Sequence, residues 1–539
     1  MLYFEPPGHG ALAAGILVSS CLCLVVAAYI QFLPPHKRGN IFFGRGRYNL
    51  PPGPADQPLV GSLLPWLRAR NGGQWVPWLV EQARYGDMTT LHMGTKTWVL
   101  LNNSRAVNEI ISRRAAIVHE RPYMPIAGGL VSQNRRFFLL KTADWRVGRR
   151  LVGHLQLGAT KDHEQIIDEA SLGLLCAFLD SSKLWYRHIY RYPMAIMHKV
   201  ITGRPLLKTT AELQDLQRVT STFLTSINSH LVDFFPQLER IVPRPLQFWR
   251  RRWEEMGRFH YRVMSRWWDG LTSLIADDEN EASFVRHALH GYAGTAEERA
   301  MYLTMLLMSA GADNPRMTMN AWVMACISYP EVMQRVRGDL DRLCGSGDGG
   351  LRLPSLDDLP QMSYLCAVIK EVLRWRPTVP LMPQRVLVED MDLEWDDGKI
   401  YRFPAGTEFL VNSIPVCTNG YDRPDEFRPE RWLDRESGHG MEQDLWQFAF
   451  SGGKRYCVGY KLAQKELFVA FARLLYCFDF SFAGGDGEKV DDTKLNAFEP
   501  GEPFPVKVSV RSRAHEKLIR NRAGECRNWG PDEKEDVIR

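Results

Sequence analysis

The chain has 539 residues, of which 45% are hydrophobic, 11% aromatic and 24% charged. This composition is typical of a globular protein and excludes a disordered or fibrous chain. Lysine and arginine number 67 against 62 acidic residues, so the formal net charge of +5 gives no reason to expect nucleic acid as a partner. The ten cysteines are scattered, apart from Cys21 and Cys23, and indicate a reduced compartment.

An uncharged apolar run covers residues 11–33 and is long enough to cross a bilayer as a helix. Residues 1–10 lack lysine and arginine, and the run is longer than a signal-peptide core, so a cleaved signal is the weaker alternative. Basic residues follow the run, whereas only Glu5 precedes it. We expect a single-pass anchor in the endoplasmic reticulum membrane, and the positive-inside rule places residues 1–10 in the lumen and the rest of the chain in the cytoplasm.

The rest of the chain divides into three parts. Residues 34–58 are basic and proline-rich, and the fixed φ angles of proline predict a stiff spacer between membrane and globule. Residues 59–513 contain no long repeat, low-complexity tract or second linker, which favours one large catalytic domain. Residues 514–539 are polar and charged, and we expect them to form a frayed tail.

Most segments of this domain that have a regular apolar pattern place their apolar residues three and four positions apart, as in a helix. Helices are predicted over residues 105–113, 145–155, 166–179, 300–327, 330–343 and 362–375. Strand patterns are few: residues 88–93 and 97–101 predict a hairpin around Gly94, and residues 408–412 predict another strand. The fold class is therefore mainly α with small β-sheets.

The most specific motif is FSGGKRYCVG at residues 450–459. It resembles the haem-binding loop F-x-x-G-x-R-x-C-x-G of the cytochrome P-450 family, with which all five specified positions coincide. The resemblance implies the cytochrome P-450 fold, a haem b cofactor (iron protoporphyrin IX) with Cys457 as its iron ligand, and cofactor contacts from Phe450, Arg455 and Gly459. Glycines let backbone N–H groups approach a thiolate, and a helix that begins near Gly459 favours the anion. The alternative is a structural cysteine buried in a glycine-rich turn.

A charge pair lies upstream, where Glu371 and Arg374 have the spacing that places both on one helix face. Glu255 and Arg258 share this spacing, and for them we expect a solvated pair. The segment FRPERW begins 53 residues after Arg374, and in the resembled family such a segment adds an arginine, here Arg431. The resemblance implies a buried cluster that supports the cysteine loop without taking part in catalysis.

Further cofactor contacts are implied by the same resemblance. Trp145 and Arg149 have i,i+4 spacing on a predicted helix and present two N–H donors to a propionate. Arg385, which precedes a strand-like stretch, matches a family arginine that binds a propionate from the other side. The alternatives are a surface helix and a charge at a strand edge.

The segment AGADNP at residues 310–315 departs from the distal-helix pattern A-G-x-D/E-T-T/S of that family. Asp313 keeps the acid, whereas Asn314 and Pro315 replace both hydroxyl residues. The resemblance makes Asp313 and Asn314 the candidate catalytic residues for proton delivery to O2, with Asn314 able to hold a water. Pro315 is expected to open the helix. The alternative is a kinked core helix with a buried aspartate.

The resemblance implies a monooxygenase that inserts one atom of O2 into a lipophilic small molecule. We find no glycine fingerprint for a nucleotide, so electrons are expected from NADPH through NADPH-cytochrome P-450 reductase. A basic face suited to that acidic partner is predicted from Arg146, Arg150, Lys454, Lys461 and Lys465, although these residues can also serve solubility.

The substrate is not identified by the sequence. By resemblance, the pocket segments are residues 118–140, 223–238, 305–312, 378–383 and 497–504, and their apolar character favours a lipophilic over a charged compound. The stretch VDFFP at residues 232–236 and the anchor resemble filamentous-fungal members of secondary metabolism, including the O-methylsterigmatocystin oxidoreductase-like group. Two alternatives remain: a haem-thiolate isomerase, dehydratase or peroxygenase that needs no reductase, and a non-catalytic haem sensor.

Overall fold

The computed structural model describes residues 49–55, 57, 60–276, 283–292, 297–346, 350–433, 449–485, 490–491, 493–495, 501–522 and 524. The predicted anchor at residues 11–33 lies outside this part of the chain. Across the part that is described, no helix has the length and apolar character that crossing a membrane requires.

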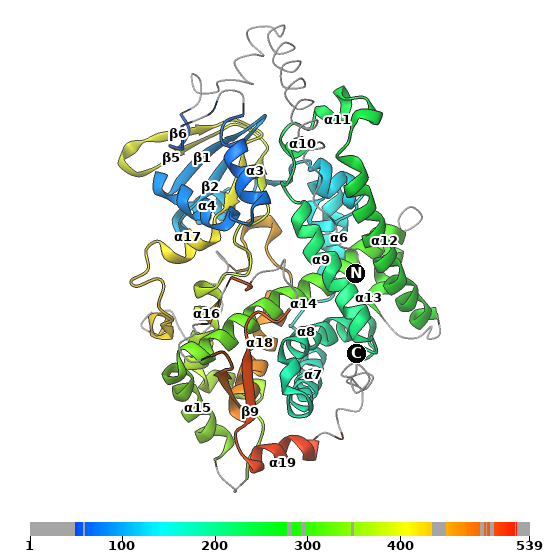
Figure 1. Ribbon diagram of the computed structural model, residues 1–539, viewed down its shortest axis with the longest axis vertical. Helices are drawn as coiled ribbons and strands as arrows, with labels where there is room; N and C mark the ends of the chain where they lie inside the picture. Colours follow the sequence, from blue (N-terminus) through cyan, green and yellow to red (C-terminus); the bar gives the residue numbers. More distant parts are fainter. Residues whose placement is uncertain are drawn as a thin grey trace.

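Helices make up most of the molecule, as the sequence predicts (Figure 1). The α-helices are α3 (Leu63–Asn71), α4 (Trp75–Gln82), α5 (Ser104–Val107), α6 (Thr142–His154), α7 (Lys161–Asp180), α8 (Trp185–Thr202), α9 (Thr210–Ser226), α10 (Leu231–Phe234), α11 (Leu238–Ile241), α12 (Arg250–Ala276), α13 (Phe284–Gly291), α14 (Glu297–Ser328), α15 (Pro330–Cys344), α16 (Ser363–Trp375), α17 (Ser413–Thr418), α18 (Tyr460–Cys477) and α19 (Arg513–Arg522). Short 3-10 or π-helical turns used below are η3 (Asn108–Arg113), η4 (Pro125–Val131), η5 (Phe137–Leu139), η10 (Pro429–Trp432) and η11 (Gly453–Arg455).

The largest sheet has five strands in the order β1-β2-β7-β4-β3 and lies at one end of the molecule (Figure 1). Its strands are β1 (Met88–Met93), β2 (Lys96–Leu101), β7 (Glu408–Val411), β4 (Arg385–Leu387) and β3 (Val118–Glu120), and the pairs β5 (Met391–Glu394) with β6 (Ile400–Phe403) and β8 (Phe478–Phe482) with β9 (Val506–Val510) form two smaller sheets. Strands β1 and β2 pair antiparallel around Gly94, whose φ of 61° is accessible to glycine, so the predicted hairpin is confirmed. The predicted strand at residues 408–412 is confirmed by β7, which pairs with β2 in parallel.

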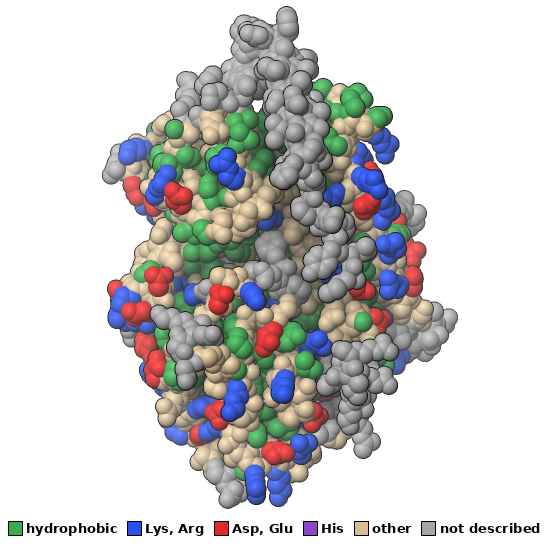
Figure 2. All heavy atoms as spheres, in the orientation of Figure 1, with side chains coloured by type: hydrophobic (Ala, Val, Ile, Leu, Met, Phe, Trp, Pro, Cys, Tyr) green, Lys and Arg blue, Asp and Glu red, His purple; other side chains and the backbone are tan. Residues whose placement is uncertain are grey.

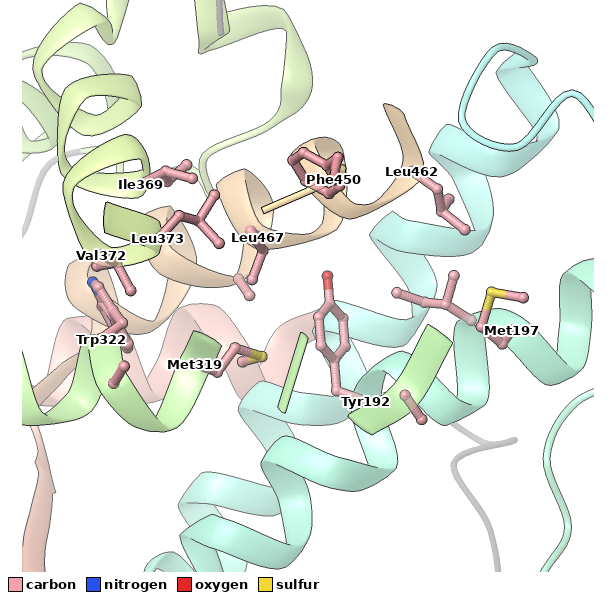
Figure 3. Packing of buried hydrophobic residues seen from close by; sticks show 14 of the residues in the cluster. Tyr192, Met197, Met319, Trp322, Ile369, Val372, Leu373, Phe450, Leu462 and Leu467 are labelled. Atoms are coloured by element: carbon pink, nitrogen blue, oxygen red, sulfur yellow. The ribbon is translucent and has the colours of Figure 1, made fainter. Parts of the chain in front are cut away.

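The core lies among α7, α8, α14, α16 and α18. Figure 3 shows apolar side chains of α8, α14, α16 and α18 packed together. Trp322 of α14 stacks on Phe471 of α18, with ring centroids 4.4 Å apart and planes at 9°. Tyr192 of α8 reaches across and donates its hydroxyl to the carbonyl of Glu466 on α18 at 2.9 Å. These contacts fix α14 and α8 against α18, the helix that follows the cysteine loop.

Helix α14 is continuous through Pro315, so the predicted opening of the helix is not seen in its secondary structure. Proline has no N–H, and therefore the carbonyl of Gly311, four residues earlier, has no helical donor. Almost every side chain between Met301 and Cys326 is buried, but Leu306 and Ala310 are partly exposed and Asn314 is exposed. Because these three positions are four residues apart, they lie along one face of the helix, which is less covered than the other faces. We call these three residues the exposed line of α14.

Some segments differ from the expectations. Three long helices, α8, α9 and α12, lie outside the segments whose periodicity predicts a helix. Helix α8 contains Pro193, a residue type that disfavours a helix interior. The predicted helix at residues 105–113 is split into α5 and the π-helical η3. The predicted frayed tail is wrong for α19, whose Ile519 is buried.

Candidate functional site

The cysteine loop closes on itself in front of α18. The backbone N–H of Cys457 donates to the carbonyl of Phe450 at 2.9 Å. Gly453 has a φ of 64°, and a Cβ at this position would lie 2.3 Å from the carbonyl oxygen of Ile111 in η3. The glycine is therefore required twice, by backbone conformation and by close packing.

The sulfur of Cys457 lies at the N-terminal end of α18. Burial raises the pKa of the Cys457 thiol, while a hydrogen bond from the Gly459 N–H and the charge of Arg149 act in the opposite direction. The Cys457 side chain nevertheless has exposed surface, although protein atoms surround it. An accessible thiol in the interior fits a metal ligand, because coordination to a metal removes the proton that the protein alone does not displace.

Two predicted cofactor arginines meet beside this loop. Arg385 donates to the Ser451 hydroxyl at 2.9 Å, and Arg455 donates to the carbonyls of His119 and Leu140, each at 2.9 Å. Both guanidinium groups are buried, yet Nη1 of each has no hydrogen-bond partner among the described residues. Burial first and then repulsion from Arg455 lower the pKa of Arg385 to about 9, and burial lowers that of Arg455 to about 10.

A third buried arginine, Arg121, was not singled out from the sequence. Its guanidinium donates to the carbonyls of Phe138 at 3.0 Å and Pro383 at 2.7 Å, and burial together with the charges of Arg385 and Arg455 holds its pKa well below the usual value. An arginine-proline pair after a short strand is the only signal in the sequence, and it is too weak to separate from a turn. We call Arg121, Arg385 and Arg455 the arginine cluster.

Trp145 and Arg149 lie on α6 next to the arginine cluster. The guanidinium of Arg455 lies 4.5 Å from the centre of the Trp145 ring, which stacks on Phe137. Arg149 donates to the carbonyl of Tyr456 at 2.9 Å, one residue before the cysteine. Arg455 belongs to the loop itself, and the structure brings Trp145 and Arg149 of α6 and Arg385 of β4 to it.

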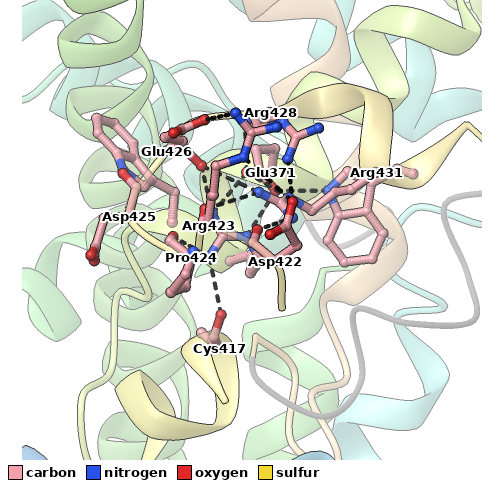
Figure 4. Close-up of polar contacts among 12 residues, drawn as sticks. Glu371, Cys417, Asp422, Arg423, Pro424, Asp425, Glu426, Arg428 and Arg431 are labelled. Carbon is pink, nitrogen blue, oxygen red and sulfur yellow. Dashed lines mark hydrogen bonds and ion pairs between the residues drawn. The ribbon is translucent and has the colours of Figure 1, made fainter. Parts of the chain in front are cut away.

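Glu371 and Arg374 of α16 form a polar centre with residues 417–432 (Figure 4). Arg374 binds the carboxylate with two parallel bonds of 2.9 and 2.8 Å, and Arg431 adds a third at 3.1 Å. Further donors to the carboxylate are the Trp432 indole at 2.9 Å and the Arg428 backbone at 2.8 Å. The expected cluster is present, whereas Glu255 pairs with Arg251 rather than with the expected Arg258.

Asp313 is buried on the side of α14 that faces α8 and α9. One carboxylate oxygen accepts from Nε of Arg316 at 3.2 Å, while the other has no partner among the described residues. Burial raises the pKa of Asp313, and Arg316, Thr220 and Gln217 oppose that shift. The hydroxyl of Tyr190 on α8 is also buried without a described partner. Burial and then the charge of Asp313 raise the pKa of Tyr190, and the charge of Arg316 opposes that shift. The acid is thus bound to a cation on its own helix.

Asn314 follows Asp313 but belongs to the exposed line of α14. Its side-chain amide has no hydrogen-bond partner among the described residues, whereas its backbone carbonyl accepts from the hydroxyl of Thr318 at 3.1 Å. The amide is therefore free to bind a water or ligand oxygen. No bond joins Asn314 to Asp313, so the two predicted catalytic residues are adjacent in sequence but differ in environment.

The residues of this site fit an iron porphyrin with two propionates. Three buried like charges in the arginine cluster repel one another, and unpartnered donors remain on two of them. Carboxylates are the natural partners of such donors. The accessible sulfur of Cys457 supplies the ligand for iron. Within the described part of the chain, no group of His, Cys, Asp and Glu is arranged to hold a metal ion by itself.

Comparisons with known proteins agree with this fit. A sequence model described as cytochrome P450 matches residues 51–508. Cytochrome P450 monooxygenase aneD of Aspergillus aculeatus is 27% identical over 94% of this chain and 96% of its own length, and cytochrome P450 monooxygenase FrzL of Cladobotryum sp is 26% identical over 90% and 92%. A zebra fish cytochrome P450 solved with progesterone has the same fold, with a TM-score of 0.62 at 20% identity over 81% of this chain and 99% of its own. Haem is the cofactor of this family of oxidoreductases, and the chain belongs to the cytochrome P450 family.

Proposed function

We propose that the protein is a haem-thiolate monooxygenase that inserts one oxygen atom of O2 into a lipophilic small molecule of fungal secondary metabolism. The observation that carries the proposal is the meeting of an accessible interior cysteine with unpartnered buried arginines from separate segments. The similarity to fungal monooxygenases over most of the chain supports the reaction class.

The residues of the site have distinct tasks in this proposal. Haem bound at Cys457 supplies the iron at which O2 is activated, with electron density from the thiolate favouring cleavage of the O–O bond. The arginine cluster, Trp145 and Arg149 orient the propionates. Asn314 holds a water on the exposed line of α14, and Asp313 receives protons from the side of α8 and α9 and passes them toward that water.

Electrons come from NADPH through a reductase that docks on a basic face. Arg146, Arg150, Lys454 and Lys461 are exposed around the cysteine loop, whereas Lys465 is engaged by Glu164 at 2.6 Å. These four side chains form no ion pair among the described residues, and their charge would attract an acidic flavoprotein at low ionic strength. Turnover that falls steeply with added salt supports this docking, and turnover independent of salt contradicts it.

A membrane location is part of the same proposal. Hydrophobic side chains gather on the surface at the end of the molecule that carries α3 and α11 (Figure 2). Leu64 of α3 is exposed, as are Ile241 of α11 and, just beyond it, Leu246 and Phe248. A lipid surface would cover these side chains, which supports an anchor formed by residues 11–33.

The direct test is oxygen incorporation. The full chain is expressed with a fungal reductase in a host that contains the neighbouring biosynthetic enzymes, and metabolites are compared with those of a Cys457→Ser strain under isotopically labelled O2. A labelled product that requires NADPH, reductase and Cys457 is the expected result. Product without label, or formed equally without reductase, contradicts a monooxygenase.

A second candidate is a haem-thiolate isomerase, dehydratase or peroxygenase. Asn314 and Pro315 favour it, because neither side chain offers the transferable hydroxyl proton that O–O cleavage uses in the resembled pattern. This enzyme would turn over with peroxide or rearrange an oxygenated substrate without NADPH. The reductase requirement in the labelling experiment separates the two candidates.

A further inference from the structure

Another buried arginine with unpartnered donors among the described residues lies outside the cofactor site. Arg136, between η4 and η5, is only 5% exposed, and its Nε and Nη2 are buried without a hydrogen-bond partner among the described residues. No described carboxylate forms an ion pair with it. Its neighbour Arg135 is ion-paired with Glu298 nearer the surface, so an acid was within reach of this segment and Arg136 nevertheless turns inward.

Three helices surround this guanidinium, and none of their described carboxylates forms an ion pair with it. Its carbon lies 3.7 Å from the centre of the Phe223 ring of α9. Tyr302 of α14 has a buried hydroxyl without a described partner, and burial raises its pKa, so it remains a neutral donor. His260 of α12 is neutral as well, because burial and the charge of Arg136 lower its pKa to about 3.

The arginine cluster provides the precedent within the same molecule. There, buried guanidinium groups with unpartnered N–H donors face the place where the cofactor carboxylates fit. A buried cation without a counter-ion is unfavourable, and proteins retain one where a ligand completes it. Arg136 has the same features, but it lies beside α9, α12 and Tyr302 and not beside the cysteine loop.

The position relative to Asn314 limits the shape of the ligand. Tyr302 precedes Asn314 by twelve residues on the continuous helix α14, which is ~18 Å along the helix axis. Leu306 and Ala310, the partly exposed residues of α14, lie between them. A molecule that reaches from one position to the other is elongated and mostly apolar, with its polar group at one end.

We propose that Arg136, assisted by the Tyr302 hydroxyl, binds a carboxylate of the substrate and that the substrate is a lipophilic acid oxidised at a carbon remote from that carboxylate. This inference rests on the proposed function and names the substrate class. It refines the expectation of an uncharged lipophilic compound, since the body of the molecule is apolar and one end is anionic.

Paired probes test the inference on the holoenzyme. Spectral titration near neutral pH compares dodecanoate with methyl dodecanoate, and 4-biphenylacetate with its methyl ester, so that one pair is flexible and the other flat. The wild type is expected to bind at least one acid about tenfold more tightly than its ester, the lower range for a charge-assisted bond. Arg136→Met is expected to abolish the preference, and Tyr302→Phe to reduce it. Arg135→Met, the matched control, is expected to preserve it.

Several outcomes would overturn the inference. Equal affinity for acid and ester in both pairs would do so, as would a preference that survives in Arg136→Met. Thermal unfolding without probe gives a second criterion: an unpaired cation predicts that Arg136→Met unfolds at the same or a higher temperature, whereas failure to fold would identify a structural brace. A wild type that shows a thiolate-type ferrous carbonyl spectrum and NADPH-dependent turnover, but no acid preference, would leave the proposed function intact and remove only this inference.

Discussion

Two groups of arginines, one around Glu371 and one beside the cysteine loop, differ in how completely they are hydrogen-bonded. Around Glu371, every nitrogen of Arg374 has an acceptor and both carboxylate oxygens have several donors. In the arginine cluster, Arg385 and Arg455 are equally buried, yet each keeps a donor without a described partner, and the single nearby acid, Glu120, lies 3.7 Å from Arg455.

This difference in hydrogen bonding distinguishes a structural network from a ligand site. A buried charge network whose hydrogen bonds are all made within the chain stabilises the folded state without a ligand. A buried network that is incomplete leaves polar groups that cost free energy until a ligand pairs with them. The first group therefore holds α16 to residues 417–432, and we expect the second to bind an anionic ligand.

The largest effect is expected for the complete group. Arg374→Ala leaves the Glu371 carboxylate buried without its main partner, which costs about 3–5 kcal/mol. Protein without haem is therefore expected, measured as haem per polypeptide in the purified fraction. Arg251→Ala, which breaks the exposed pair with Glu255 on α12, is the control and is expected to change stability by ~0–1 kcal/mol. A normal haem content in Arg374→Ala would contradict the structural role of the group around Glu371.

Asp313 is an intermediate case, since it is ion-paired with Arg316 but keeps one oxygen without a described partner. If that oxygen serves proton transfer, Asp313→Asn slows NADPH-dependent product formation by about 100-fold, the usual lower range for loss of a general acid. Asn314→Thr restores a hydroxyl and is expected to raise the fraction of NADPH that ends in product. Unchanged coupling in both variants would place the proton path elsewhere.

Arg385→Gln should have a smaller effect that sharpens the contrast. It removes a charge from the incomplete cluster, so the fold is expected to persist while haem leaves faster by about tenfold, as the loss of one charge-assisted bond of ~1.5 kcal/mol implies. Transfer of haem to an excess of apomyoglobin measures this rate. A variant that unfolds like Arg374→Ala would show that the two groups do not differ in kind.

Asp233 is a buried acid that forms no ion pair among the described residues, so it tests whether hydrogen bonds alone keep a buried carboxylate charged. Its oxygens accept from the backbone N–H groups of Ile126 and His230, yet burial raises its pKa to about 6. The unfolded chain releases this proton at lower pH than the folded chain, so wild-type stability falls as pH rises through about 6. Asp233→Asn is expected to gain about 1–2 °C in melting temperature relative to wild type between about pH 5 and about pH 8. A difference independent of pH would contradict the raised pKa.

Much of the site could be predicted from the sequence because its determinants are local. The loop at residues 450–459 carries its own glycines, and the spacing of Glu371 and Arg374 is set by one helix turn. The hairpin at Gly94 and the long helix α14 follow from short-range periodicity in the same way.

The remaining features depend on packing between distant segments. Arg135 and Arg136 are adjacent and identical in type, and only the positions of α9, α12 and α14 decide which of them turns inward. Arg121 became part of the site because β3 and β4 bring it to the residues before Arg385. Helix α8 forms around Pro193, which disfavours a helix interior, because packing against α7 and α14 stabilises it.

The ferrous carbonyl spectrum of the purified full-length protein tests the central claim that the Cys457 thiolate binds haem iron. The wild type is predicted to show the red-shifted Soret band of a thiolate-ligated carbonyl complex, and Cys457→His the band of an imidazole-ligated one. A colourless wild type, an imidazole-type band in the wild type, or a thiolate-type band that persists in Cys457→His would contradict the account.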